Sequence, residues 1–159
     1  MWRFQGLVRQ QAALANGAVG KRWISLYEQM KMMDKLAEES GRLRFTGYND
    51  TGFHINNVFH EGSVMCHRNL ILSWTPRTFK EITPESLSIF QLLRPAPDLL
   101  LVGCGRSVQF FGKEVEDFLD SNKIKLEAID SRNAASTFNF LNDEGRSVAA
   151  AIIPCSSEA

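Results

Sequence analysis

The sequence predicts an α/β protein in which an antiparallel β meander precedes a β-α-β-α-β unit. Between residues 42 and 74, apolar and polar residues tend to alternate, as they do in strands with one buried face. After residue 83, helix-like apolar spacing alternates with short apolar runs, which is typical of strands joined by helices. A content of 44% hydrophobic and 23% charged residues excludes a wholly disordered chain. A length of 159 residues favours one folded domain.

The first 25 residues have the composition of a mitochondrial transit peptide. Residues 1–27 carry four basic and no acidic side chains, are rich in Ala, Gln and Gly, and place apolar residues at loosely helical spacing. A secretory signal would need an unbroken apolar core, which this stretch lacks. We therefore expect residues 1–25 to be a transit peptide, with a disordered basic tail as the alternative.

A helical linker is predicted over residues 26–41. Gly41 suits the position just after the end of a helix. A methionine-rich face can adapt to different partners, although methionines at helical spacing more often serve packing, and the segment can also be a plain linker. The residues that share this face are Leu26, Met30, Met33 and Ala37.

The predicted domain covers residues 42–155 and is followed by a tail at residues 156–159. Turn residues divide its first part: Asn49–Gly52 favours a loop, and Asn56–Asn57 tolerates the positive φ of a two-residue hairpin. Pro76 ends the last strand. The expected strands lie near 43–47, 53–55, 58–60, 63–67 and 70–74.

The second part begins with a helix signal at Thr83–Glu85, where a hydroxyl, a proline and a carboxylate follow one another. Leu87, Phe90 and Leu93 share a face of this helix, and prolines at 95 and 97 end it. The run Asp98–Val102 is apolar at consecutive positions, as expected for a strand covered on both faces.

Two glycines then turn the chain into a helix that should begin near Ser107. Its buried stripe would contain Val108, Phe111, Val115, Phe118 and Leu119. Right-handed crossovers make the three strands of this part parallel neighbours, and we expect a single core to serve both parts of the domain. The remaining elements are a strand at 125–130, a helix at 133–142 with Ala134, Ala135, Phe138 and Leu141 inward, and a strand at 148–153.

Charge and cysteine content exclude several functions. Residues 28–159 hold 14 basic against 18 acidic side chains, a formal charge of −4, which argues against nucleic acid as a partner. Cys66, Cys104 and Cys155 are odd in number and lack paired spacing, so a reducing compartment fits better than a disulfide framework. No apolar run reaches the roughly 18 residues of a membrane span.

The glycine turn is the first candidate for chemistry. Gly103 and Gly105 lie where a doubly wound fold binds phosphate, but the third glycine of the dinucleotide fingerprint is missing. A tight turn therefore competes with an anion or small-ligand pocket. Arg106 and a helix N-terminus would lower the pKa of Cys104, yet the sequence places no base beside this thiol.

The second candidate is the polar segment 130–146. Capping explains Ser131 or Asn133, whereas Thr137 and Asn139 have no such local reason. We expect a ligand- or partner-binding surface here that also includes Arg132 and Arg146. No metal site is predicted, because the separations among His54, His60, His67 and Cys66 match no ligand motif.

Four segments resemble, in order, the assembly factor 3 family of mitochondrial complex I (NADH:ubiquinone oxidoreductase), whose wider relatives form a small domain family of unknown biochemical function. The resemblance covers about residues 43–154. Family members often carry Gly-Thr-Gly where this chain has Gly-Cys-Gly, which further weakens the case for Cys104 as a nucleophile. The four segments are Tyr48–Asn56, Ile82–Ser86, Leu101–Gly105 and Asn133–Arg146.

The resemblance implies a single three-layer α/β domain at the matrix side of the mitochondrial inner membrane, associated with that membrane peripherally if at all. It implies a non-enzymatic assembly factor that binds early peripheral-arm intermediates, with a second complex I assembly factor and quinone-module subunits as partners. It brings no catalytic residues, cofactor or metal. The alternatives are a small-ligand or anion sensor that uses the turn at residues 103–107, and an uncharacterised enzyme.

Overall fold

The structure, a computed structural model, describes residues 25–32 and 41–155. Residues 26–32 form a helix in a unit separate from the domain. At its start the Ser25 hydroxyl accepts the Glu28 N–H and the Glu28 carboxylate accepts the Ser25 N–H, both at 3.2 Å, which is a capping box. Residues 1–24 of the expected transit peptide, residues 33–40 of the linker and the tail at 156–159 lie outside the described residues. Within the described ranges, no helix is long and apolar enough to cross a membrane.

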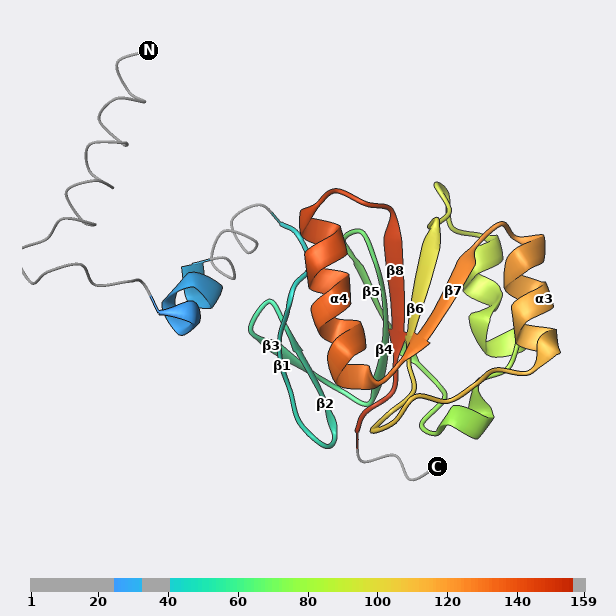
Figure 1. The fold of residues 1–159 in the computed structure, drawn as a ribbon, viewed down its shortest axis with the longest axis horizontal. Helices are drawn as coiled ribbons and strands as arrows, with labels where there is room; N and C mark the ends of the chain where they lie inside the picture. Colours follow the sequence, from blue (N-terminus) through green and yellow to red (C-terminus); the bar gives the residue numbers. More distant parts are fainter. Residues whose placement is uncertain (1–24, 33–40, 156–159) are drawn as a thin grey trace, which may run out of the picture. The chain divides into compact units, whose positions relative to one another are not determined.

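The domain begins with five consecutive strands and continues with strands that alternate with helices, as predicted (Figure 1). Its strands are β1 (Phe45–Tyr48), β2 (Gly52–Ile55), β3 (Val58–Glu61), β4 (Ser63–His67), β5 (Leu70–Trp74), β6 (Leu99–Gly103), β7 (Lys125–Ile129) and β8 (Val148–Ile152). Its helices are the 3-10 turns η1 (Phe79–Glu81) and η2 (Glu85–Gln91) and the α-helices α3 (Lys113–Ser121) and α4 (Ser131–Asp143).

The expected meander is divided between two sheets. β1-β2-β3 form a separate three-stranded antiparallel sheet, whereas the β4-β5 hairpin joins a five-stranded sheet of order β5-β4-β8-β6-β7. The division falls at Gly62, whose φ is +83°. All five residues of β4 are buried, while β3 is largely exposed, so β4 needs cover on both faces and β3 does not.

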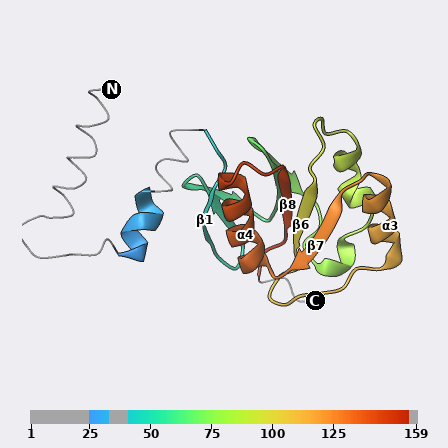
Figure 2. The same ribbon diagram turned by 45° about the horizontal axis from the view of Figure 1, so that its top comes forward.

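The β-α-β-α-β unit is confirmed. β6 pairs in parallel with β7 on one side and with β8 on the other. α4 and the three-stranded sheet cover one face of the large sheet, and α3 and η2 cover the other, which gives three layers (Figures 1 and 2).

The expectation of a single core is wrong, because the large sheet separates two apolar clusters. Along β6, Leu101 belongs to the cluster under α4, while Leu100 and Val102 belong to the cluster under α3 and η2. Successive side chains of a strand point to opposite faces, so a sheet covered on both sides must fill two cores. This alternation explains why the strand is apolar at every position.

The helices differ from the predictions in three places. The helix after Pro84 is a 3-10 helix, in which Leu87 and Phe90, three residues apart, lie on the same side and are buried. The helix expected from about Ser107 begins only at Lys113, and Val108 is exposed. α4 begins two residues earlier than expected, with all four predicted inward residues buried.

Candidate functional site

Hydrogen bonds connect the glycine turn after β6 to two other segments of the chain. The Ser131 hydroxyl accepts the Gly105 N–H at 2.8 Å and donates to the Ile153 carbonyl at 2.6 Å, while the Ser131 N–H donates to the Gly105 carbonyl at 2.9 Å. Gly105 has a φ of +92°. The turn therefore joins the ends of β6 and β8 to the start of α4. Because α3 begins eight residues further on, the turn does not lead directly into the helix N-terminus on which the predicted anion pocket depended.

Gly103 is required by close packing. A Cβ atom at this position would lie 2.5 Å from Ile152 Cγ2 and 3.0 Å from Ser131 Cα. We expect Gly103→Ala to lower the free energy of unfolding by about 1–3 kcal/mol, because the core is overpacked. Gly47→Ala is the matched control, because the nearest atom to an added Cβ there is His54 Cδ2 at 3.6 Å, an ordinary van der Waals distance. Urea denaturation of both variants measures the difference, and equal unfolding midpoints would contradict this packing argument.

The cysteines do not have the environment of a catalytic thiol. Burial raises the pKa of the Cys104 thiol and outweighs the backbone hydrogen bond at Gln109, which lowers it; the Asp130 carboxylate adds a smaller rise. The sequence-based expectation of a lowered pKa is therefore wrong. Arg106 does not supply the expected effect, since its Nε donates to the Cys155 carbonyl at 2.7 Å. Burial also raises the pKa of Cys66 to about 12.

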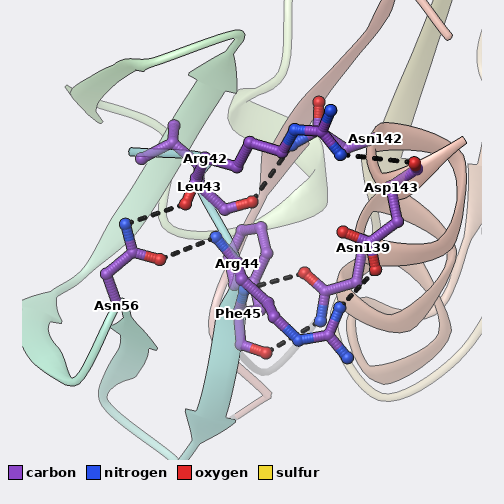
Figure 3. Close-up of polar contacts among 8 residues, drawn as sticks. All are labelled: Arg42, Leu43, Arg44, Phe45, Asn56, Asn139, Asn142 and Asp143. Carbon is purple, nitrogen blue, oxygen red and sulfur yellow. Dashed lines mark hydrogen bonds and ion pairs between the residues drawn. The ribbon is translucent and has the colours of Figure 1, made fainter. Parts of the chain in front are cut away.

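Asn139 had no local explanation in the sequence. Its side-chain amide forms the two backbone hydrogen bonds to β1 that a neighbouring strand would otherwise form (Figure 3). Its Oδ1 accepts the Phe45 N–H and its Nδ2 donates to the Phe45 carbonyl, both at 2.8 Å. One turn later, Asn142 Nδ2 donates to the Leu43 carbonyl at 3.1 Å. Side chains of α4 thus satisfy the backbone at the beginning of the three-stranded sheet.

The opposite side of this segment is held by Asn56 and the end of α4 is held by arginines (Figure 3). Asn56 Oδ1 accepts the Arg44 N–H at 2.9 Å and Asn56 Nδ2 donates to the Arg42 carbonyl at 3.0 Å. The buried Arg44 side chain forms an ion pair with Asp143 at 2.5 Å. Cations near a helix C-terminus also interact favourably with the helix dipole. These contacts fix the segment through which the chain enters the domain.

The other predicted residues of segment 130–146 separate into two groups. At the start of α4, the carboxylate of Asp130 accepts the Asn133 N–H at 3.0 Å and its side-chain amide at 2.6 Å, so Asp130 is the N-cap. The Arg132 guanidinium lies 5.6 Å from the centre of the Tyr48 ring. Thr137 and Arg146 lie further along the chain and line a cleft.

This cleft, of about 490 Å³, lies on the α4 side of β6 and β7. Buried Leu101 and half-buried Ile129 provide an apolar surface, while the exposed Lys125, Glu127 and Arg146 provide charge. The lining residues are Asp98, Leu99, Leu101, Lys125, Glu127, Ile129, Thr137 and Arg146. Among the described residues no group of three His, Cys, Asp or Glu side chains could hold a metal ion.

On the opposite side of β7, a second hollow of about 220 Å³ adjoins Leu126 and Ala128. Phe110, which is 91% exposed, and Phe111 contribute to it. The β7 residues are not among those predicted from the sequence to bind a ligand or partner. The available signal was the alternation of charged and apolar residues in Lys125–Ile129, which is typical of a strand that is not covered on both faces.

Comparisons with known proteins agree with the fold. Residues 45–153 match the family described as a protein of unknown function (DUF498/DUF598). A Mth938-like domain from Bordetella pertussis, solved by NMR, is 25% identical with a TM-score of 0.67 over 75% of this chain and 90% of that one. A crystal structure from Bordetella parapertussis is 31% identical with a TM-score of 0.66, over 71% and 96% of the two chains.

Three similar sequences carry the same name, NADH dehydrogenase (ubiquinone) 1 alpha subcomplex assembly factor 3. The Drosophila melanogaster protein is 37% identical over 70% of this chain, which spans 59% of that protein's length. The Xenopus tropicalis protein is 35% identical over 79% of this chain and 69% of its own. The Homo sapiens protein is 31% identical over 81% of this chain and 70% of its own. The resemblance found in the sequence is thus confirmed.

Proposed function

The chain belongs to the DUF498/DUF598 family and to the family of complex I assembly factor 3 proteins, and on this premise we propose that it acts as an assembly factor for mitochondrial complex I. The observation that carries the proposal is an identity of 31–37% to relatives with that name. We further propose that it binds early peripheral-arm intermediates together with a second assembly factor, on the matrix side of the inner membrane, after import through residues 1–25.

We infer that this role rests on binding rather than on catalysis. The raised pKa values of Cys66, Cys104 and Cys155 disfavour thiolate chemistry at neutral pH. Exposed apolar side chains, among them Phe110 and Phe140, offer area for protein contacts. An assembly factor of this kind would cover apolar subunit surface that otherwise aggregates, and would leave when the final neighbour docks.

Among the residues predicted from the sequence, we propose Thr137 and Arg146 as partner-contacting residues because both line the cleft beside β7. Arg132 and Asn133, exposed at the other end of α4, are proposed as secondary contacts. We propose that Gly103, Gly105 and Asn139 support the fold, because their close contacts and hydrogen bonds lie within the domain. A contribution from them to binding would be indirect.

Loss of the gene is expected to deplete assembled complex I and to leave subassemblies, which native gel electrophoresis of mitochondrial membranes measures. Re-expression of the full chain should restore the complex. A Cys104→Ser chain should restore it equally, because a buried thiol with a raised pKa is not required for binding. Normal complex I levels without the gene would contradict the assembly role. A folded Cys104→Ser chain that fails to restore the complex would instead favour an enzymatic activity.

A further inference from the structure

β7 forms an edge of the five-stranded sheet whose outer side is unpaired within the part of the chain that the structure describes. On its inner side, the Lys125 N–H donates to the Asp98 carbonyl at 3.0 Å, and the Ile129 carbonyl accepts the Cys104 N–H at 2.8 Å. Residues of a parallel strand alternate in the direction of their backbone groups. The N–H and C=O groups of Leu126 and Ala128 therefore point away from β6, towards the open edge.

Both faces next to this edge are hollowed. The larger cleft opens on the α4 side, and the smaller hollow, with Phe110 beside it, opens on the α3 side. A strand added to β7 would project its side chains alternately to these two faces. The edge thus offers main-chain partners together with space for side chains on both sides, which is what recognition by strand addition requires.

We propose that β7 binds an extended segment of a partner protein, which adds to the large sheet as a further strand. The proposal rests on the proposed function, since the segment would belong to a peripheral-arm subunit of complex I. The charges of the cleft define its chemistry. Lys125 and Arg146 call for an acidic residue, and Glu127 calls for a basic residue two positions away on the same face. Apolar residues on the other face would contact Phe110 and Leu126.

A second copy of this chain is a poorer occupant. Antiparallel self-pairing centred on Glu127 would place this carboxylate opposite its own copy, which is destabilising. Pairing centred on Leu126 would place Lys125 opposite Glu127. In this register the paired stretch would be short, because the residues just before Lys125 are not available for pairing. Lys123 has a φ of +59°, and the Ile124 N–H already donates to the Leu119 carbonyl at 3.0 Å. A strand from another protein has a different sequence and can therefore pair with β7 in another register.

The test uses overlapping synthetic peptides that cover the peripheral-arm subunits of complex I, with the full chain as the binding protein. A bound peptide is expected to slow amide hydrogen exchange at Leu126 and Ala128 in particular. Leu126→Pro should weaken its binding at least about tenfold, because proline removes the outward N–H and blocks the edge. This substitution removes no hydrogen bond to β6 in the inferred pattern.

Charge variants test the proposed register without a change in the backbone. Glu127→Lys should weaken peptide binding about threefold, and Lys125→Glu should act in the same direction. Asp120→Lys on the exposed side of α3 is the matched control for the change in net charge, and should bind as the wild type does. If Leu126→Pro does not fold, the effect of Glu127→Lys on peptide binding and the hydrogen exchange of the wild type test the proposal instead.

The double variant Lys125→Glu with Glu127→Lys distinguishes binding of a partner segment from binding of a second copy of this chain. A foreign peptide should bind it more weakly than it binds either single variant. Self-association that is lost in the single variants and restored in the double variant would overturn the proposal in favour of a second copy. The proposal would also fail if no peptide protected the two edge amides. In cells, wild-type rescue of complex I tests the proposed function, and full rescue by Glu127→Lys and by a folded Leu126→Pro chain would overturn the edge proposal alone.

Discussion

Leu100→Asp is expected to abolish folding of the domain. Leu100 is fully buried in β6, between the paired strands β7 and β8 and against the cluster under α3 and η2. Truncating such a leucine costs about 2–5 kcal/mol. Burying a polar group without partners adds about 2–7 kcal/mol. The sum is comparable with the total stability of a typical domain, about 5–15 kcal/mol.

Circular dichroism and a thermal melt measure the effect, and the variant should show no cooperative unfolding transition. Leu92→Asp makes the same chemical change at a side chain that is 76% exposed, so it should melt close to the wild type. A Leu100→Asp protein with a cooperative transition within a few degrees of the wild type would show that β6 is not the buried support of the sheet.

Asn139→Ala is expected to lower the free energy of unfolding by about 2–4 kcal/mol. The substitution leaves both the N–H and the C=O of Phe45 without their partners at a part-buried site, and each unsatisfied group costs about 1–3 kcal/mol. The loss should be largest at the beginning of the three-stranded sheet. Urea denaturation gives the overall change, and amide hydrogen exchange at Phe45 shows where the structure opens.

Two further variants sharpen this experiment. Asn139→Asp keeps an acceptor for the Phe45 N–H but turns a carboxylate towards the Phe45 carbonyl, so it should also destabilise the domain. Ser136→Ala, on the exposed side of the same helix, should change stability by less than about 0.5 kcal/mol. If Asn139→Ala were as stable as Ser136→Ala, the two hydrogen bonds between the Asn139 side chain and the Phe45 backbone would not contribute to stability.

Much of the fold could be predicted because it depends on near neighbours in the sequence. The inward side of α4 follows from its apolar spacing, and the parallel strands follow from the alternation of apolar runs with helical segments. The hairpin between β2 and β3 follows from Asn56 and Asn57, which both adopt a positive φ. Each of these predictions rests on residues that lie close together in the sequence.

The candidate site could be predicted only in part. Segment 130–146 differs from its surroundings in its polar residues, but the reason for Asn139 is a backbone partner 94 residues away. The late start of α3 was missed because segment 104–112 has no regular structure, and the ties between its first residues and Ser131 cross more than 20 residues. Apolar spacing alone does not distinguish such a segment from a helix.

The sequence by itself determined the α/β class, the order of most elements and the resemblance to a family, because periodicity and short motifs are local properties of the chain. Only the tertiary structure decided which strands share a sheet and that β7 has an open edge. It also showed that Ile152 leaves no room for a side chain at Gly103. These features depend on which distant segments meet. For that reason the candidate binding edge became visible only in the folded chain.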